Sequence, residues 1–102
     1  MKIATQVDEK KHHVTFSLEG ELDVHQVKGL KSTISEAIVA GDWSYAIDLA
    51  KVGYLDSSGL GMLVYLKKEI TRQGGRLQLL NVAESIRSVF QLTRLDEFFG
   101  LK

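Results

Sequence analysis

The chain lacks cysteine and proline, and it carries no net charge. It has 102 residues, with 13 Lys and Arg against 13 Asp and Glu. Without cysteine, thiol nucleophiles, thiolate zinc sites, iron–sulfur clusters and disulfides are excluded, which suits a reducing cytoplasm. Without a basic excess, the chain lacks the electrostatic footprint of a protein that grips phosphate backbones. We therefore expect a cytoplasmic protein that does not bind nucleic acid.

Long apolar runs are also missing. The longest strongly apolar stretch, 59–66, is much shorter than the roughly 20 residues that cross a bilayer. Asp8 interrupts the N-terminal segment before the apolar region of a signal peptide could form. We expect no membrane span and no signal peptide. The length is typical of one domain, here 1–102, and an apolar content of 44% suffices for its core.

The charges are unevenly distributed along the chain. Residues 19–56 contain seven acids and three bases, whereas residues 57–102 contain seven bases and four acids. Such sorting can steer a protein partner, although solvated helix faces explain it as well.

Hydrophobic periodicity predicts two strands and a helix in the first half of the chain. Alternating apolar residues predict a hairpin over 3–18 with one buried face. Apolar residues at helical spacing predict a helix over 24–40. Asp23 and Gln26 form a capping-box pattern at its start, and Gly41 is the expected C-cap.

The second half is predicted to alternate strands and helices. The apolar segment 45–50 predicts an inner strand covered on both faces, followed by a loop over 51–56. Asp48 within that strand could be an unusual buried acid, but an exposed edge or a hydrogen bond facing a helix explains it as well. The dense apolar run from Leu60 predicts a central, largely buried helix. Further predictions are a helix stop at Gly74-Gly75, a strand over 77–80, a helix capped by Asn81 with Glu84, and a helical turn over 95–99.

The resulting order, β-β-α-β-α-β-α-α, predicts an α/β fold. Its sheet is mixed but mostly parallel and is flanked by helices, with right-handed crossovers between the later strands. In such sheets, functional groups gather beyond the carboxyl ends of the parallel strands. Three segments reach that edge, namely 20–23, 51–58 and 81–83.

The middle segment, Asp56-Ser-Ser-Gly-Leu-Gly61, is the strongest candidate for a functional site. Its serines fall at a helix N-terminus, where unpaired N–H groups and the helix dipole favour negative charge. A phosphate added there would be tolerated by the fold. The alternative is that Asp56 and the serines only cap the helix while the glycines allow close packing.

Other chemistries do not fit the sequence. The glycine pair of this segment lacks the third glycine of a dinucleotide loop, and no lysine follows as in a P-loop. Ser58 has Asp56 where a nucleophile elbow requires glycine, and no histidine can be placed beside it. His12 and His13 point to opposite sides if extended, so a metal pair is not expected. We expect no catalytic residue, no cofactor and no metal.

Two strings of residues resemble a known family. The string Tyr-Leu-Asp-Ser-Ser-Gly-Leu-Gly-Met-Leu over 54–63 follows the strand 46–50, and Leu-Glu-Gly-Glu-Leu-Asp occupies 18–23. Together they resemble the anti-sigma-factor antagonists, which are single STAS domains of bacteria. The similarity extends over nearly the whole chain. One departure is Ala83, where many relatives have proline.

The resemblance implies a phosphorylation site and a partner-binding surface. In that family the serine directly after the aspartate is phosphorylated, which corresponds to Ser57 here, with Ser58 as its neighbour. An acidic loop beside the phosphorylation site contributes to the partner-binding surface. The residues implied in partner binding and switching are Glu21, Asp23, Asp56, Ser58, Gly59 and Leu60.

The resemblance also implies a mechanism and partners. The unmodified chain would bind an anti-sigma factor that is also a serine kinase, and would thereby free the sigma factor. Phosphorylation would abolish this binding until a serine phosphatase removes the phosphate. Apart from the resemblance, zero net charge and a modest apolar excess fit a monomer, and without an ATP-binding loop we expect the chain to supply the acceptor and not to be an enzyme.

Two alternatives belong to other classes. A STAS scaffold could be bound constitutively to a transporter or to a regulator unrelated to sigma factors, but the complete Asp-Ser-Ser-Gly segment and the free-standing length argue against it. A small enzyme could use Asp56 or Ser57 as a nucleophile, but an evident base is missing.

Overall fold

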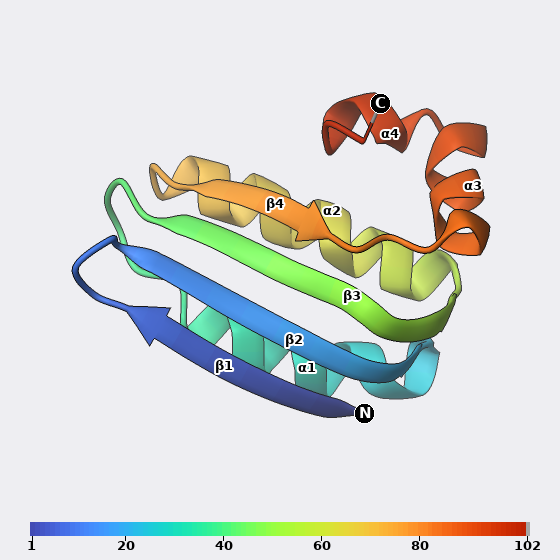
Figure 1. The fold of residues 1–102 in the computed structure, drawn as a ribbon, viewed down its shortest axis with the longest axis horizontal. Coiled ribbons are helices and arrows are strands. Elements are labelled where there is room, and N and C mark those ends of the chain that lie inside the picture. Colours follow the sequence, from blue (N-terminus) through green and yellow to red (C-terminus); the bar gives the residue numbers. More distant parts are fainter. Residues whose placement is uncertain (102) are drawn as a thin grey trace.

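The computed structural model describes residues 1–101, and it confirms the predicted order of elements. The strands are β1 (Lys2–Asp8), β2 (His13–Leu22), β3 (Ser44–Leu55) and β4 (Arg76–Leu80), and the helices are α1 (Val24–Glu36), α2 (Ser57–Arg72), α3 (Glu84–Leu92) and α4 (Leu95–Phe98) (Figure 1). Strand β1 pairs antiparallel with β2, and β2, β3 and β4 pair in parallel. The predicted α/β fold with a mostly parallel mixed sheet is therefore correct.

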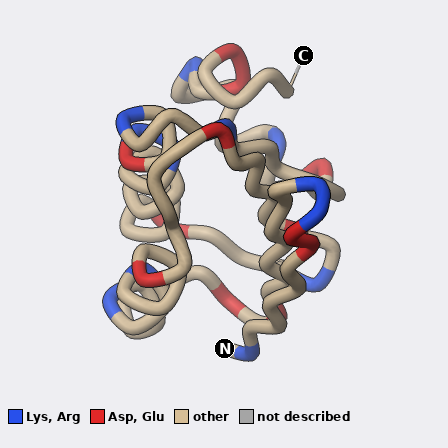
Figure 2. The backbone as a smooth tube through the Cα atoms, turned by 90° about the vertical axis from the view of Figure 1, so that its left-hand side faces the viewer, with Lys and Arg blue, Asp and Glu red and all other residues tan. Residues whose placement is uncertain are grey.

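Both long helices lie on the same face of the sheet. The strands lie in sequence order, β1-β2-β3-β4, so the two parallel connections step in the same direction across the sheet. Right-handed crossovers then place α1 and α2 on one side. Figure 2 shows this layer of helices beside the layer of strands. The expectation that the segment 45–50 is covered on both faces holds for Ala46, which is buried, but fails for Ala50, which is exposed on the same outer face in a hollow of about 670 Å³.

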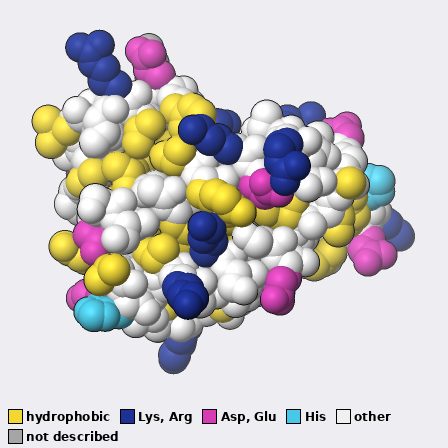
Figure 3. Space-filling view, turned by 180° about the vertical axis from the view of Figure 1, so that it is seen from behind, with side chains coloured by type: hydrophobic (Ala, Val, Ile, Leu, Met, Phe, Trp, Pro, Cys, Tyr) yellow, Lys and Arg dark blue, Asp and Glu magenta, His cyan; other side chains and the backbone are white. Residues whose placement is uncertain are grey.

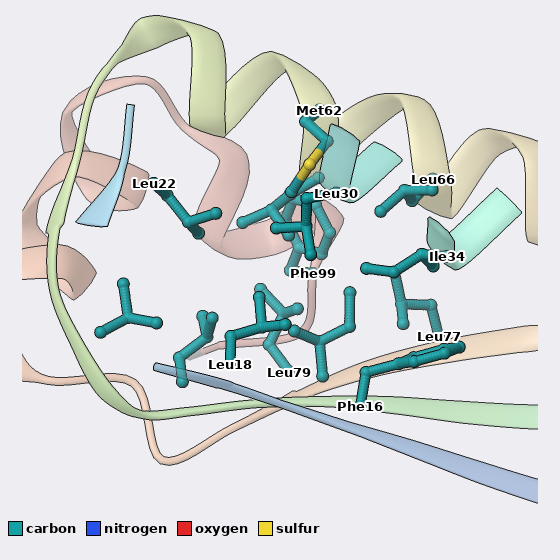
Figure 4. Close-up of a cluster of buried hydrophobic side chains, with 14 of the residues drawn as sticks. Phe16, Leu18, Leu22, Leu30, Ile34, Met62, Leu66, Leu77, Leu79 and Phe99 are labelled. Carbon is teal, nitrogen blue, oxygen red and sulfur yellow. The ribbon is translucent and has the colours of Figure 1, made fainter. Parts of the chain in front are cut away.

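The core fills the space between the two layers. In β2, alternate residues Val14, Phe16 and Leu18 are buried, as the predicted hairpin face requires. In Figure 4, side chains from the strands and from α1 and α2 point toward one another across this space. The edge strand β1 contributes little, because Ile3 is only partly buried and Val7 is 56% exposed.

Helix α1 ends earlier than the sequence predicts. Its C-cap is Ala37, and Gly41, the expected cap, lies in the following loop with φ of +117°. The tyrosine hydroxyl of Tyr45 accepts the backbone N–H of Val39 at 3.0 Å, which holds the chain in a non-helical course. A tertiary contact thus overrides the helical spacing of 37–40.

Strand β3 is longer than predicted, and this extension positions the candidate site. The predicted loop 51–56 is strand as far as Leu55, and it pairs with the end of β2 up to the partners Leu22 and Leu55. Two register shifts near Glu19 and Gly20 disturb the alternation of side chains, which is why the apolar pattern stops early. The two parallel strands therefore end side by side.

Helix α2 is amphipathic rather than buried on all sides. Its buried residues include Leu60, Leu63 and Ile70, whereas Gly61 and Tyr65 are exposed. The prediction of a largely buried helix holds only for the face toward the sheet. The opposite face is open to solvent.

Asn81 does not cap α3, contrary to the sequence-based expectation. The N-cap is Ala83, which makes no side-chain hydrogen bond. Asn81 has φ of 55°, and its Nδ2 donates to Oδ1 of Asp48 at 3.0 Å. This hydrogen bond lowers the pKa of Asp48 below its usual value. The hydrogen bond from the backbone N–H of Ala50, at 2.9 Å, lowers the pKa further but has a smaller effect. Asp48 is thus only partly buried, and its carboxylate accepts hydrogen bonds from the segment after β4 and from its own strand rather than from a helix.

We predict that Asn81→Gly removes a stabilisation that exists only when Asp48 is ionised. Glycine accepts the positive φ, so the substitution deletes mainly the amide. Because the pKa is lowered in the folded state, this stabilisation is present above the unfolded pKa of about 4 and is lost as pH falls through the folded pKa. Urea unfolding should show a larger difference between parent and variant at pH 7 than at pH 2.5. An equal difference at both pH values would contradict this account.

Candidate functional site

Asp56, directly after β3, joins the N-termini of two helices. Its Oδ1 accepts the backbone N–H of Gly59 at 3.0 Å, as the N-cap of α2, and its Oδ2 accepts that of Val24, the first residue of α1, at 3.1 Å. The backbone N–H of Asp56 donates to the carbonyl of Leu22 at 3.2 Å. One carboxylate therefore satisfies free N–H groups of both helices and holds them beside each other.

Gly59 allows α2 to approach the end of β2. A Cβ atom at this position would lie 2.4 Å from the carbonyl oxygen of Leu22 and 2.9 Å from its Cβ. No side chain larger than hydrogen fits this contact. The next residue, Leu60, is 8% exposed and belongs to the core. Both residues anchor the first turn of α2 from inside, so neither is placed to touch a partner directly.

The two serines of the segment differ in exposure. Ser57, the first residue of α2, is exposed, whereas Ser58 is partly buried. Within residues 1–101, neither hydroxyl has a hydrogen-bond partner. The Ser57 hydroxyl stands at the positive end of the helix dipole, where a negative charge is favourable. Ser57 is also open to solvent in the folded chain.

The acidic loop at the end of β2 lies beside this segment. Asp23 is partly buried and caps α1 by accepting the N–H of His25 at 3.0 Å. Gln26 does not complete the expected capping box, since its Oε1 accepts the N-terminal ammonium at 3.3 Å. Glu21 is exposed and pairs in register with Tyr54 of β3. The structure thus brings two of the three predicted edge segments together.

Sequence reasoning missed one exposed side chain at this edge. Val24 follows the N-cap Asp23, binds Asp56 through its backbone, and is 60% exposed. The sequence did contain a signal for this exposure. Val24 is apolar and follows the capping residue Asp23, but it does not fall on the apolar face that the helical spacing predicts for α1. The candidate site is therefore a mixed surface of acidic, hydroxyl and apolar groups.

The histidines of the first hairpin are engaged in local contacts. His12 stacks on Trp43 with ring centroids 4.7 Å apart, and Nδ1 of His13 lies 2.6 Å from the hydroxyl of Ser44. In the part of the chain that the structure describes, no group of three or more His, Asp or Glu side chains could hold a metal ion. Nor does any helix there have the length and apolar character needed to cross a membrane.

The fold agrees with comparisons to known proteins. The family model described as STAS domain matches residues 4–102, and the chain therefore belongs to the STAS domain family. The resemblance inferred from the sequence is confirmed. A curated relative, the anti-sigma-B factor antagonist of Bacillus subtilis, is 30% identical over 101 residues, covering 99% of this chain and 92% of the relative.

Two solved structures of the anti-sigma factor antagonist SpoIIAA are similar to this chain. The anti-sigma factor antagonist SpoIIAA in its unphosphorylated form has a TM-score of 0.70 at 30% identity, covering 88% of this chain and 82% of that one. The phosphorylated form of SpoIIAA from Bacillus has a TM-score of 0.68 at 31% identity, covering 92% and 86%. The chain is similar to both forms.

We predict that Asp56→Asn destabilises the protein although asparagine is a good N-cap. The amide offers one acceptor oxygen, so one of the two helix N–H groups loses its partner. Each lost cap costs about 1 kcal/mol, so we expect a loss of about 1 kcal/mol for Asp56→Asn and about 2 for Asp56→Ala in urea unfolding. Asp23→Asn, which caps a single helix, is the matched control and should be nearly neutral. Equal effects of Asp56→Asn and Asp23→Asn would show that the shared capping contributes nothing.

We also predict that Gly59→Ala lowers the free energy of unfolding by about 2 kcal/mol or more, because α2 must move away from Leu22. The control is Gly29→Ala within α1, where a Cβ meets nothing within 4 Å. That substitution should raise stability by about 0.5–1 kcal/mol through helix propensity. Chemical denaturation measures both, and a neutral Gly59→Ala would disprove the tight contact.

Proposed function

We propose that this chain is an anti-sigma-factor antagonist whose binding is switched off by phosphorylation of Ser57. The observation that carries the proposal is the exposed hydroxyl of Ser57 on the first residue of a helix whose next residues are fixed in the core. Support comes from the relatives named as anti-sigma factor antagonists, one of them solved with and without phosphate.

In the unmodified state, the chain binds an anti-sigma factor that is also a serine kinase, and the sigma factor is released. The kinase supplies ATP and magnesium. The γ-phosphoryl group passes from ATP to Oγ of Ser57, ADP is the leaving group, and the hydroxyl proton is released. This chain provides the acceptor and no catalytic group. A serine phosphatase then removes the phosphate and restores binding.

The switch is electrostatic in this proposal. Phosphoserine adds a charge of about −1.5 to −2 at an edge that already holds Asp23 and Asp56. Like charges brought together at an interface cost several kcal/mol, and each ~1.4 kcal/mol reduces affinity tenfold. The helix N-terminus stabilises the phosphate within the chain, so the fold persists while the partner dissociates.

The proposed function also assigns a location, an oligomeric state and a role to each residue of the site. The chain acts in the cytoplasm as one domain over 1–102 and as a monomer that pairs transiently with its kinase. Ser57 is the acceptor, with Glu21, Asp23 and Ser58 beside it at the surface. Asp56, Gly59 and Leu60 position the acceptor helix from within.

We predict one phosphate on Ser57 after incubation with the cognate anti-sigma-factor kinase, ATP and magnesium. Mass spectrometry should locate it on Ser57 in the parent and in Ser58→Ala, and should find none in Ser57→Ala. Modification confined to Ser58 would show that the acceptor is misassigned. Ser57→Asp should keep the parental far-UV circular dichroism and lose kinase affinity about tenfold or more. Parental affinity of Ser57→Asp would rule out the electrostatic switch.

A further inference from the structure

The solvent face of α2 presents one exposed residue per turn. Ser57, Gly61, Tyr65 and Lys68 follow one another at helical spacing, and all four are exposed. We call this row the outer stripe of α2. It begins at the proposed phosphorylation site and continues along the helix.

Gly61 is the unusual member of this stripe. Glycine in the interior of a helix costs about 1 kcal/mol relative to alanine. Close packing explains Gly59, where a Cβ would lie 2.4 Å from Leu22, and Gly75, where it would lie 2.6 Å from the carbonyl of Trp43. At Gly61, a Cβ would meet nothing within 4 Å. Nothing inside the chain requires glycine at this position; the same is true of Gly29 in α1, but only Gly61 lies on the outer stripe one turn after Ser57.

The next residue of the stripe connects α2 to α1. Tyr65 is 41% exposed, and Nζ of Lys31 lies 3.9 Å from the centre of its ring. This cation–π contact joins the outer surfaces of the two helices. The result is an aromatic platform one turn beyond the bare backbone of Gly61.

Unpaired positive charge surrounds this platform. Lys28 lies one turn before Lys31 on α1, and Lys68 follows Tyr65 on α2. Within residues 1–101, no carboxylate lies within 4 Å of the ammonium of Lys28, Lys31 or Lys68. Figure 3, seen from the side opposite to Figure 1, shows basic side chains standing along the middle of this face. The face is complementary to an acidic surface.

We propose that the face formed by Lys28, Lys31, Gly61, Tyr65 and Lys68 is the docking surface for an acidic segment of the kinase, whose main chain passes directly over Gly61. This inference rests on the proposed function and adds the chemistry of the partner surface. Contact between Gly61 and the main chain of the kinase would explain why position 61 is glycine, because any larger side chain there would keep the two backbones apart. Ser57 lies one turn from Gly61, so its phosphate adds negative charge at the edge of a positive face and repels the acidic segment.

The first test replaces Gly61 by alanine and by glutamine and measures kinase affinity by isothermal titration calorimetry. We expect Gly61→Gln to weaken binding about tenfold or more and Gly61→Ala to weaken it less, with unfolding midpoints equal to or above that of the parent. The matched controls are Gly29→Ala and Gly29→Gln. Gly29 is also an exposed glycine within a helix, but it lines a hollow beside Ile3, away from the stripe. These controls should bind as the parent does.

The second test reverses charge on the docking surface. Lys28→Glu and Lys68→Glu should each weaken kinase binding, and the effect should shrink between 50 and 500 mM salt, roughly as screening lengths predict. Lys10→Glu and Lys11→Glu, in the turn between β1 and β2, change the net charge equally and should have no effect.

The outcomes separate this inference from the proposed function. If the parent is neither bound nor phosphorylated by the kinase, the proposed function fails. If the parent is bound and phosphorylated but Gly61→Gln binds equally well, the docking surface is wrong. Tighter binding by the glutamate variants on α1 and α2 would show that the partner surface is basic, which would also overturn the inference.

Discussion

The shared carboxylate of Asp56 is the interaction on which the arrangement of the site depends. Its two oxygens accept hydrogen bonds from N–H groups in the first turns of α1 and α2. The N-termini of the two crossover helices are therefore held together at one edge of the sheet. Gly59 permits the close approach that this geometry requires. Ser57 is exposed at the start of α2, whereas Gly59 and Leu60 after it are buried. The position of the Ser57 hydroxyl thus depends on the contacts that hold the first turn of α2.

The proposed switch makes use of a division between two environments. At the strand ends, the carboxylates of Asp23 and Asp56 already serve helix N–H groups and are partly buried. Along the helices, lysines stand without carboxylate partners among residues 1–101. A phosphate on Ser57 would lie where these regions meet. There the helix N-terminus favours it within the chain, while a visiting acidic surface opposes it. The phosphate on Ser57 would therefore be favourable for the stability of the folded chain and unfavourable for its affinity for the acidic partner.

Much of this architecture could be predicted from the sequence, for identifiable reasons. Periodicity located β2 and both crossover helices, because their buried faces repeat regularly. It failed where a tertiary contact decided the outcome. Tyr45 ends α1 before Gly41, register shifts carry β3 through the expected loop, and Asn81 binds Asp48 instead of capping α3. The double capping by Asp56 was also beyond reach, because its second partner, Val24, is 32 residues away in the chain.

The turn between β1 and β2 lies at the opposite end of the strands from Ser57 (Figure 1). Residues 9–12 are exposed there, and they contribute no side chain to the hydrophobic core. A fluorophore attached to this turn would change its rotational diffusion when the chain joins or leaves a larger assembly, without obstructing the surface that does the joining. The geometry of the sheet therefore provides a reporter position from which binding and release of the proposed kinase could be followed in real time.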